Sequence, residues 1–267
     1  MTSQGKVYLI GAGPGAADLI TLRGARLLAQ ADVVFYDALV HADTLALAAN
    51  ASKVAVGKRC GRVSTDQRFI NRQLVEAAHK YAIVVRLKGG DPLLFGRAQE
   101  EIAALELAGV EYEIVPGVTS ALAAHAELGV SLTQRGVARS VVFATPRIGP
   151  DQRASDWAAS VCAADTAVLY MAAGQGAQIS EALQAAGMHA ATPVAIVENA
   201  TLSNARQIFT TLEGLHDIDD WQIGGPALVC LGEVYANRLR AAETAAQSAQ
   251  AAATNIPGFP ARKVSGG

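Results

Sequence analysis

In the stretch Arg86-Leu87-Lys88-Gly89-Gly90-Asp91-Pro92, a glycine loop directly follows an apolar, strand-like run that begins at Ile83. A similar loop, Gly11-Ala12-Gly13-Pro14-Gly15, follows the first strand-like run of the chain. Glycine has no Cβ, so the backbone N–H and C=O groups of such loops can approach a ligand closely, while the prolines stiffen the turns. Two loops of this kind predict one ligand held between them.

Short β-branched runs alternate with helix-like segments in the first half of the chain. The expected strands are residues 7–10, 33–36, 54–56, 83–87 and 113–115. This alternation predicts a mostly parallel sheet covered by helices. One covering helix should open at the capping-box pattern Ser64-Thr65-Asp66-Gln67. The residues expected on its inner face are Phe69, Ile70, Leu74 and Ala78.

A second set of strands is expected after Pro116-Gly117. These strands are residues 141–144, 167–170, 194–197, 207–210 and 228–231. The last three are separated by short connections, which predicts a mixed sheet. We therefore expect an α/β protein with two α/β domains, at residues 1–117 and 118–240. An Ala-rich tail at 241–267, partly disordered, follows, with a helix expected from Val234 to about Ala252.

Composition narrows the classes of function. The chain has 267 residues, 51% of them hydrophobic, and a formal net charge of -2, which argues against a general nucleic-acid or membrane-surface binder. No segment is long and apolar enough to span a bilayer. The three cysteines are far apart, so neither a disulfide framework nor a structural zinc site is expected, and the histidines lack metal-ligand spacing. With no secretory signal in the first residues, a cytoplasmic location is expected.

Read alone, the first glycine loop fits a nicotinamide dinucleotide fingerprint. Gly11-x-Gly13-x-x-Ala16 follows a strand, and Asp37 ends the next strand, where an acid binds a ribose hydroxyl. However, Pro14-Gly15 occupies the place where a helix should begin, and a dinucleotide fold does not predict the second loop. A nicotinamide-dependent oxidoreductase is therefore the competing hypothesis from another class.

The ordered motifs resemble those of the tetrapyrrole methylase family over roughly residues 5–240. The motifs that carry the resemblance are Val7–Gly15, Tyr36-Asp37, Gly57-Lys58-Arg59, Arg86–Pro92, Pro116–Ser120, Leu132-Thr133-x-Arg135, Tyr170-Met171, Pro193–Asn199 and Pro226–Leu228. The resemblance implies two α/β domains with S-adenosylmethionine in the cleft between them and a tetrapyrrole in an adjoining trough. It also implies a homodimer.

The resemblance further implies cofactor contacts made mainly by small residues and backbone. The positions that match are Pro14, Gly89, Gly90, Asp91, Leu94, Thr119, Ser120, Met171, Ala200 and Ala227. By itself, Met171 is typical of a core residue. Thr119 and Ser120 by themselves could equally start a helix.

The activity implied is transfer of two methyl groups from S-adenosylmethionine to uroporphyrinogen III. The products are precorrin-2, for sirohaem or cobalamin synthesis, and S-adenosylhomocysteine. Each methylated ring must lose a proton, so a base and a proton-relaying cation are useful. The family pattern places the base at Asp37 and the acid at Lys58, although on spacing alone Asp37 could equally cap a turn.

An octacarboxylate substrate needs fixed cations, and arginine offers bidentate geometry to carboxylates. The candidate substrate-binding residues are Arg59, Arg62, Arg97, Arg135 and Arg139. Lys58-Arg59 could equally be a solvated surface pair. The chain departs from the usual family pattern at Thr145-Pro146-Arg147 and at Gln134, on the substrate side.

Two further hypotheses stay open beside the oxidoreductase. One is a methylase of the same fold that acts on a later precorrin, which the altered segment at Thr145–Arg147 would permit. The other is a protein that binds the cofactor, has lost activity and serves a regulatory role.

Overall fold

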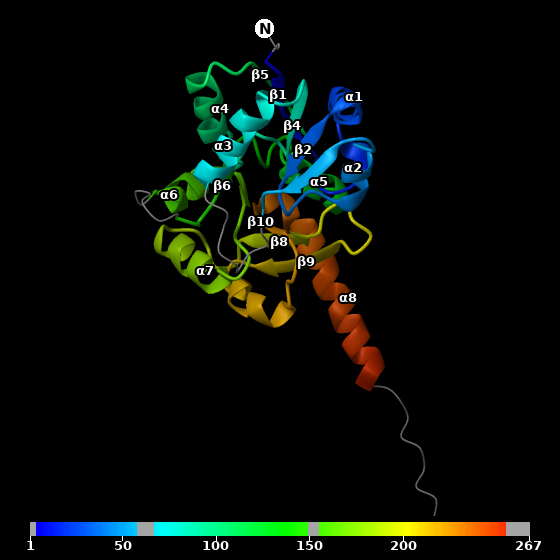
Figure 1. The fold of residues 1–267 in the computed structure, drawn as a ribbon. Helices are drawn as coiled ribbons and strands as arrows, with labels where there is room; N and C mark the ends of the chain where they lie inside the picture. The colour runs from blue at the N-terminus through cyan, green and yellow to red at the C-terminus, as the bar shows by residue number, and fades with distance from the viewer. Residues whose placement is uncertain (1–3, 58–66, 149–154, 255–267) are drawn as a thin grey trace, which may run out of the picture.

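The structure, a computed structural model, describes residues 4–57, 67–148 and 155–254, which form two five-stranded sheets (Figure 1). The strands of the first sheet are β1 (Lys6–Gly11), β2 (Val33–Tyr36), β3 (Ser52–Ala55), β4 (Ile83–Lys88) and β5 (Tyr112–Val115). Their order is β3-β2-β4-β1-β5, and every neighbouring pair is parallel. The predicted parallel sheet is confirmed, and all five carboxyl ends meet at one edge.

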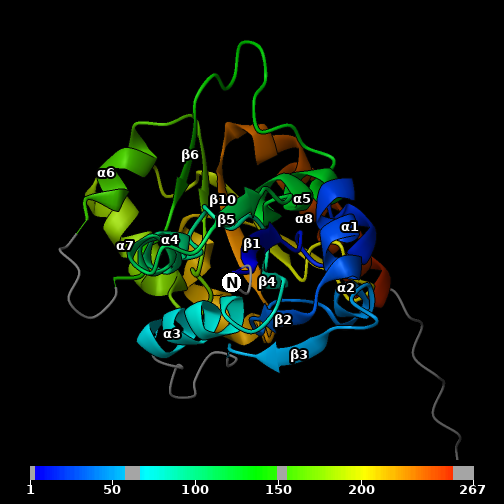
Figure 2. The same cartoon turned by 45° about the horizontal axis from the view of Figure 1, so that its top comes forward.

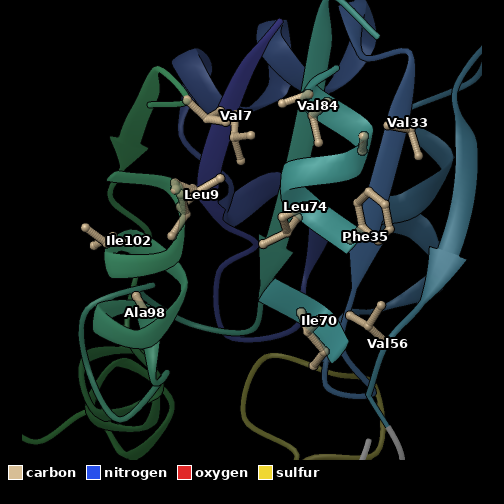
Figure 3. Close-up of a cluster of buried hydrophobic side chains, with 14 residues drawn as sticks. Val7, Leu9, Val33, Phe35, Val56, Ile70, Leu74, Val84, Ala98 and Ile102 are labelled. Carbon is tan, nitrogen blue, oxygen red and sulfur yellow. The ribbon is translucent and has the colours of Figure 1, made fainter. Parts of the chain in front are cut away.

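Helices cover both faces of this sheet, so its strands are apolar on both sides. The helices are α1 (Leu22–Gln30), α2 (Ala42–Ala46), α3 (Gln67–Ala78) and α4 (Ala98–Leu107), with a short 3-10 helix, η1 (Ala17–Leu19). Helices α3 and α4 pack against Val7, Leu9 and Phe35 (Figure 3). Alternate residues of the same strands, such as Ile10, pack on the opposite face with Leu28 of α1.

One detail of the predicted helix face is wrong. Ile70, Leu74 and Ala78 of α3 are buried as expected, but Phe69 is 44% exposed. Phe69 instead contacts Arg72 one turn further along, with the guanidinium 5.8 Å from the ring centre. The proposed capping residues 64–66 lie outside the described residues.

The second sheet is mixed, as predicted. Its strands are β6 (Val141–Ala144), β7 (Thr166–Leu169), β8 (Pro193–Glu198), β9 (Arg206–Thr211) and β10 (Ala227–Gly232). The order is β6-β7-β10-β8-β9, with β6 and β7 parallel and the other neighbours antiparallel. One face packs against α6 (Trp157–Cys162), α7 (Gly176–Ala185) and the 3-10 helix η2 (Glu213–Trp221).

The other face of the second sheet packs against α5 (Ser120–Leu128), which precedes that sheet in sequence. Ala121, Ala124 and Leu128 of α5 are buried in the same cluster as Val168 and Ala195. A domain boundary at residue 117 fits this packing and stays a prediction.

The chain continues from β10 through the 3-10 helix η3 (Glu233–Tyr235) into α8 (Ala236–Thr254), which projects from the body of the molecule (Figure 1). This agrees with the helix expected from Val234 to about Ala252. Residues 241–254 of the predicted tail are therefore helical. Residues 255–267 lie outside the part of the chain that the structure describes.

Candidate active site

Three glycines pack together where β1, β4 and β5 end. A Cβ on Gly11 would lie 2.5 Å from Gly117 Cα and 2.6 Å from the Gly90 carbonyl oxygen, and a Cβ on Gly117 would also meet that oxygen. No other residue type fits this close approach of backbones. Glycine is thus needed in these loops partly because the backbones pack against one another, and not only for the approach of a ligand.

The two glycine loops are hydrogen-bonded to each other. Gly90 N–H donates to the Gly13 carbonyl at 2.7 Å, and Gly13 N–H donates to the Gly90 carbonyl at 3.3 Å. Gly13 and Gly90 have φ values of +81° and +67°, which side chains rarely tolerate. A Cβ on Gly90 would meet only Thr119 Cα, at 3.9 Å, so the loops leave space on that side.

Asp91 joins the second loop to the end of β5. One carboxylate oxygen accepts from Leu93 N–H at 2.8 Å, and the other accepts from Gly117 N–H at 3.0 Å. Asp91 therefore holds the second loop against the backbone at Gly117. The next turn contains two non-glycine residues with positive φ, Phe95 at +53° and Arg97 at +55°.

Asp37 lies at the same edge, directly after β2, and is half-buried. One oxygen accepts from Leu39 N–H at 3.0 Å, which is the turn-capping role considered from sequence. The other accepts from Gly89 N–H at 3.3 Å, which ties Asp37 to the second glycine loop. Asp37 therefore caps a turn and also lies beside the predicted cofactor residues.

A buried charge cluster lies beneath the second loop. Glu101 of α4, fully buried, accepts from Arg86 Nε at 2.9 Å and from Lys88 Nζ at 2.9 Å, and both cations are nearly buried. Burial lowers the pKa of the Lys88 amine, and the nearby Arg86 guanidinium lowers it further. Sequence reasoning missed Glu101. The sequence feature that could have indicated a buried acid is the presence of two cations, Arg86 and Lys88, at alternate positions of an otherwise apolar strand.

The segment after β8 contacts the first glycine loop. Thr201 Oγ1 accepts from Ala16 N–H at 2.9 Å, and a Cβ on Gly15 would lie 2.9 Å from the same oxygen. Thr201 has a φ of +73°, and its own N–H donates to Glu127 of α5 at 3.0 Å. Residues near Ala200 are thereby held against the loop that contains Pro14.

Glu198, the last residue of β8, is a second buried carboxylate that sequence reasoning missed. Its Oε1 accepts from the N–H groups of Gly224 and Gly225 at 2.8 and 2.7 Å, and its Oε2 accepts from Arg206 Nε at 2.7 Å. Burial raises the pKa of this carboxyl, but these hydrogen bonds outweigh burial and hold it below its usual value. Glu198 thus orders the turn that leads into Ala227.

Met171 and Thr119, two further predicted cofactor residues, lie just after β7 and at the start of α5. Met171, directly after β7, is 42% exposed and has a φ of +56°, so the interpretation as a core residue is wrong. Thr119 is the N-cap residue of α5, but its side chain makes no capping hydrogen bond there. Its hydroxyl lies 2.5 Å from that of Tyr170, a residue to which sequence reasoning gave no role.

The predicted cations fall in different places. Lys58, Arg59 and Arg62 lie outside the described residues. Arg97 is exposed and forms a bidentate pair with Glu100 at 2.7 and 2.9 Å.

Arg135 and Arg139 are exposed on the connection between α5 and β6, which extends away from the sheets (Figure 2). Arg139 N–H donates to Asp165 at 2.8 Å. Within the part of the chain that is described, no hydrogen bond or ion pair joins either arginine to the glycine loops.

Several other features bear on the class of site. Among the described residues, no group of three or more His, Cys, Asp or Glu side chains could hold a metal ion. Cys162 and Cys230 are free thiols, and Cys60 lies outside the described ranges. None of the described helices has the length and apolarity needed to cross a membrane.

The start of α1 argues against a dinucleotide site. Such a site places the helix N-terminus directly after the glycine loop, so that free N–H groups face the pyrophosphate. Here η1 intervenes, and α1 begins only at Leu22. The first turn of α1 is capped by the chain itself, because Thr21 Oγ1 accepts from Gly24 N–H at 3.1 Å.

Comparison with known proteins identifies the family to which the chain belongs. The family model of tetrapyrrole (corrin/porphyrin) methylases matches residues 6–216. The chain belongs to this family. Its fold, a parallel and a mixed five-stranded sheet, is that of the family's solved structures.

Particular relatives are similar over most of the chain. Uroporphyrinogen-III C-methyltransferase of Pseudomonas aeruginosa is 43% identical over 232 residues, which are 86% of this chain and 94% of that protein. Siroheme synthase 1 of Cronobacter sakazakii is also 43% identical over 232 residues, but these are only 49% of that protein. The chain thus spans about half the length of the siroheme synthases that it matches.

A solved structure is also similar over most of the chain. Uroporphyrin-III C-methyl transferase of Thermus thermophilus, complexed with S-adenyl homocysteine, is 39% identical and aligns with a TM-score of 0.74. The alignment covers 86% of this chain and 98% of that one.

Proposed function

We propose that this chain transfers two methyl groups from S-adenosylmethionine to uroporphyrinogen III. The products are precorrin-2, which feeds sirohaem or cobalamin synthesis, and S-adenosylhomocysteine. Family membership supports this proposal, as does the similarity to a methyltransferase of nearly the same length. The observation that carries it is that the two glycine loops are hydrogen-bonded to each other, and that the first loop is also hydrogen-bonded to Thr201, which follows β8 of the second sheet.

The residues at this edge suit a cofactor held by close approach to the backbone. The space beside Gly90 is bordered by Thr119, and the chain there presents small residues and backbone groups. The proposed contacts are Pro14, Gly89, Gly90, Asp91, Leu94, Thr119, Ser120, Met171, Ala200 and Ala227. They come from both sheets, so the proposed cofactor site needs both halves of the chain.

When bound, the cofactor supplies an electrophilic methyl group: a pyrrole carbon forms the new C–C bond as the C–S bond breaks, and the sulfur leaves in S-adenosylhomocysteine. The methylated ring then carries positive charge and must lose one proton per transfer. In this proposal Asp37 accepts that proton, because its carboxylate is held beside the second loop by the N–H groups of Leu39 and Gly89. Lys58 is the proposed proton donor.

Fixed guanidinium groups would hold the substrate carboxylates. The proposed residues are Arg59, Arg62, Arg97, Arg135 and Arg139. A homodimer and a cytoplasmic location are part of the same proposal.

The test is anaerobic incubation of the purified protein with S-adenosylmethionine and uroporphyrinogen III, followed by mass measurement of the tetrapyrrole. A gain of two methyl groups is expected. Unmodified substrate from a protein that binds S-adenosylhomocysteine would redirect the proposal to a later precorrin. Failure to bind S-adenosylhomocysteine would refute a methyl transfer function.

The role of Asp37 is tested with Asp37→Asn, and the matched control is Asp18→Asn at an exposed position of η1. Loss of a general base should lower kcat by about 10²–10⁴-fold. Affinity for S-adenosylhomocysteine should change little, whereas a ribose-binding acid would lose affinity for its ligand instead. An unchanged kcat would exclude Asp37 as the base.

A further inference from the structure

Tyr170 joins the second sheet to two segments beside the glycine loops. It directly follows β7, and its hydroxyl lies 2.5 Å from Thr119 Oγ1, at the start of α5. Its ring centre lies 4.9 Å from that of Phe95, in the turn after the second loop. The next residue in sequence is Met171, with its positive φ. One side chain therefore contacts two segments that contribute proposed cofactor residues, and it is adjacent in sequence to a third.

The hydroxyl of Tyr170 also caps helix α5. An N-cap side chain usually accepts a hydrogen bond from the N–H two or three residues later. Thr119 is the N-cap residue here, yet its side chain makes no such bond. The N–H of Ala121, two residues later, instead donates to the Tyr170 hydroxyl oxygen at 3.2 Å. Tyr170, which follows β7, thus caps α5 in place of the side chain of Thr119.

This exchange determines where the hydroxyl hydrogens can point. Tyr170 and Thr119 share one hydrogen bond, so one of their two hydroxyl hydrogens is left over. Either hydroxyl can donate in this geometry, and donation by Tyr170 is favoured because a phenol is a stronger donor and weaker acceptor than an aliphatic alcohol. The hydrogen of Thr119 is then available. Among residues 4–57, 67–148 and 155–254, no further hydrogen-bond partner reaches either hydroxyl.

Thr119 stands next to the open side of the second loop, since the closest atom to a Cβ on Gly90 would be Thr119 Cα. We propose that Tyr170 is a positioning residue of the cofactor site: its hydroxyl holds Thr119 so that the Thr119 hydroxyl donates to an acceptor atom of the ligand bound beside Gly90. This inference rests on the proposed function. Tyr170 acts through Thr119 and needs no contact with the reacting atoms.

The test compares the affinity for S-adenosylhomocysteine, measured by isothermal titration calorimetry, in the unmodified protein and in three variants. Tyr170→Phe and Thr119→Val should each weaken binding by roughly tenfold, the effect of one lost hydrogen bond. The double variant should be no weaker than the worse single variant, because both substitutions remove the same interaction. If Tyr170 and Thr119 acted on the site independently of each other, the two losses of affinity would multiply.

The matched control is Tyr112→Phe. Tyr112 also donates a short hydrogen bond, 2.6 Å to Glu106, but it is partly buried at the start of β5, at the opposite end of that strand from Gly117. This variant should bind S-adenosylhomocysteine like the unmodified protein. If Tyr170→Phe also binds like the unmodified protein, or if the two losses multiply, the inference is wrong while the proposed function stands. If the unmodified protein does not bind S-adenosylhomocysteine, the proposed function fails and the inference fails with it.

Discussion

Two buried glutamates, Glu101 of α4 against the first sheet and Glu198 of β8 in the second, have different partners. Glu101 beneath the first sheet's loops binds two buried cations, Arg86 and Lys88. Glu198 in the second sheet binds two backbone N–H groups and Arg206, whose side chain is 47% exposed. The first cluster retains an excess positive charge in the interior. The second has one charged partner that already reaches water.

The same substitution at the two glutamates should therefore have unequal effects. Glu101→Gln removes the one carboxylate that both buried cations contact. We expect the free energy of unfolding, measured by urea denaturation, to fall by about 3–5 kcal/mol. The control is Lys88→Met, which leaves Arg86 and Glu101 as a balanced pair and should change stability by less than about 1 kcal/mol. A loss below about 1 kcal/mol for Glu101→Gln would contradict this account of the cluster.

A smaller, pH-dependent effect should come from the second half of the molecule. His125 of α5 is buried, with Nδ1 2.6 Å from the Ala121 carbonyl and Nε2 2.6 Å from the Tyr235 hydroxyl. Burial lowers the pKa of His125 below 6.5. Below pH 6.5 the unfolded chain therefore binds a proton that the folded protein resists, so stability falls as the pH falls.

This loss should reach at most about 1.4 kcal/mol per pH unit for the one proton, between pH 6.5 and the folded pKa. Urea denaturation at several pH values measures it. His125→Gln should flatten this part of the curve, whereas His79→Gln, at an exposed position, should not. An equal slope in the unmodified protein and in His125→Gln would assign the acid sensitivity to other groups.

The smallest effect is expected at Glu198. Glu198→Gln keeps a carbonyl oxygen for Gly224 and Gly225 and loses the ion pair and the hydrogen bond with Arg206, whose half-exposed side chain can turn to water. The free energy of unfolding should fall by about 1 kcal/mol or less. A loss as large as that of Glu101→Gln would remove the distinction between the two carboxylates.

Much of the fold follows from the sequence pattern, because most strands are apolar runs bounded by turn residues. The least accurate strand is β3, expected at 54–56 and observed at Ser52–Ala55. Its first residues are polar and exposed, since β3 is an edge strand and needs no apolar side chains there. The order of the strands was not predictable, because periodicity gives the faces of a strand and not its neighbours.

Only the parts of the candidate site that lie within local sequence motifs were predictable. The glycine loops were identified, but their direct hydrogen bonds were not, since no local pattern indicates that Gly13 pairs with Gly90. Glu101 looks in sequence like any solvated helix charge, and only the packing of α4 on β4 buries it. Tyr170 and Thr119 are 51 residues apart, so the exchange of the helix cap appears only in three dimensions.

The hydrogen bond from Ala16 to Thr201 spans 185 positions of the chain. During synthesis, the first glycine loop emerges early but lacks its final partner until residue 201 has left the ribosome and the end of β8 has formed. Any ligand that contacts both segments therefore distinguishes finished chains from nascent ones. Its binding free energy adds to the cooperativity of folding of the entire molecule, rather than stabilising one half alone.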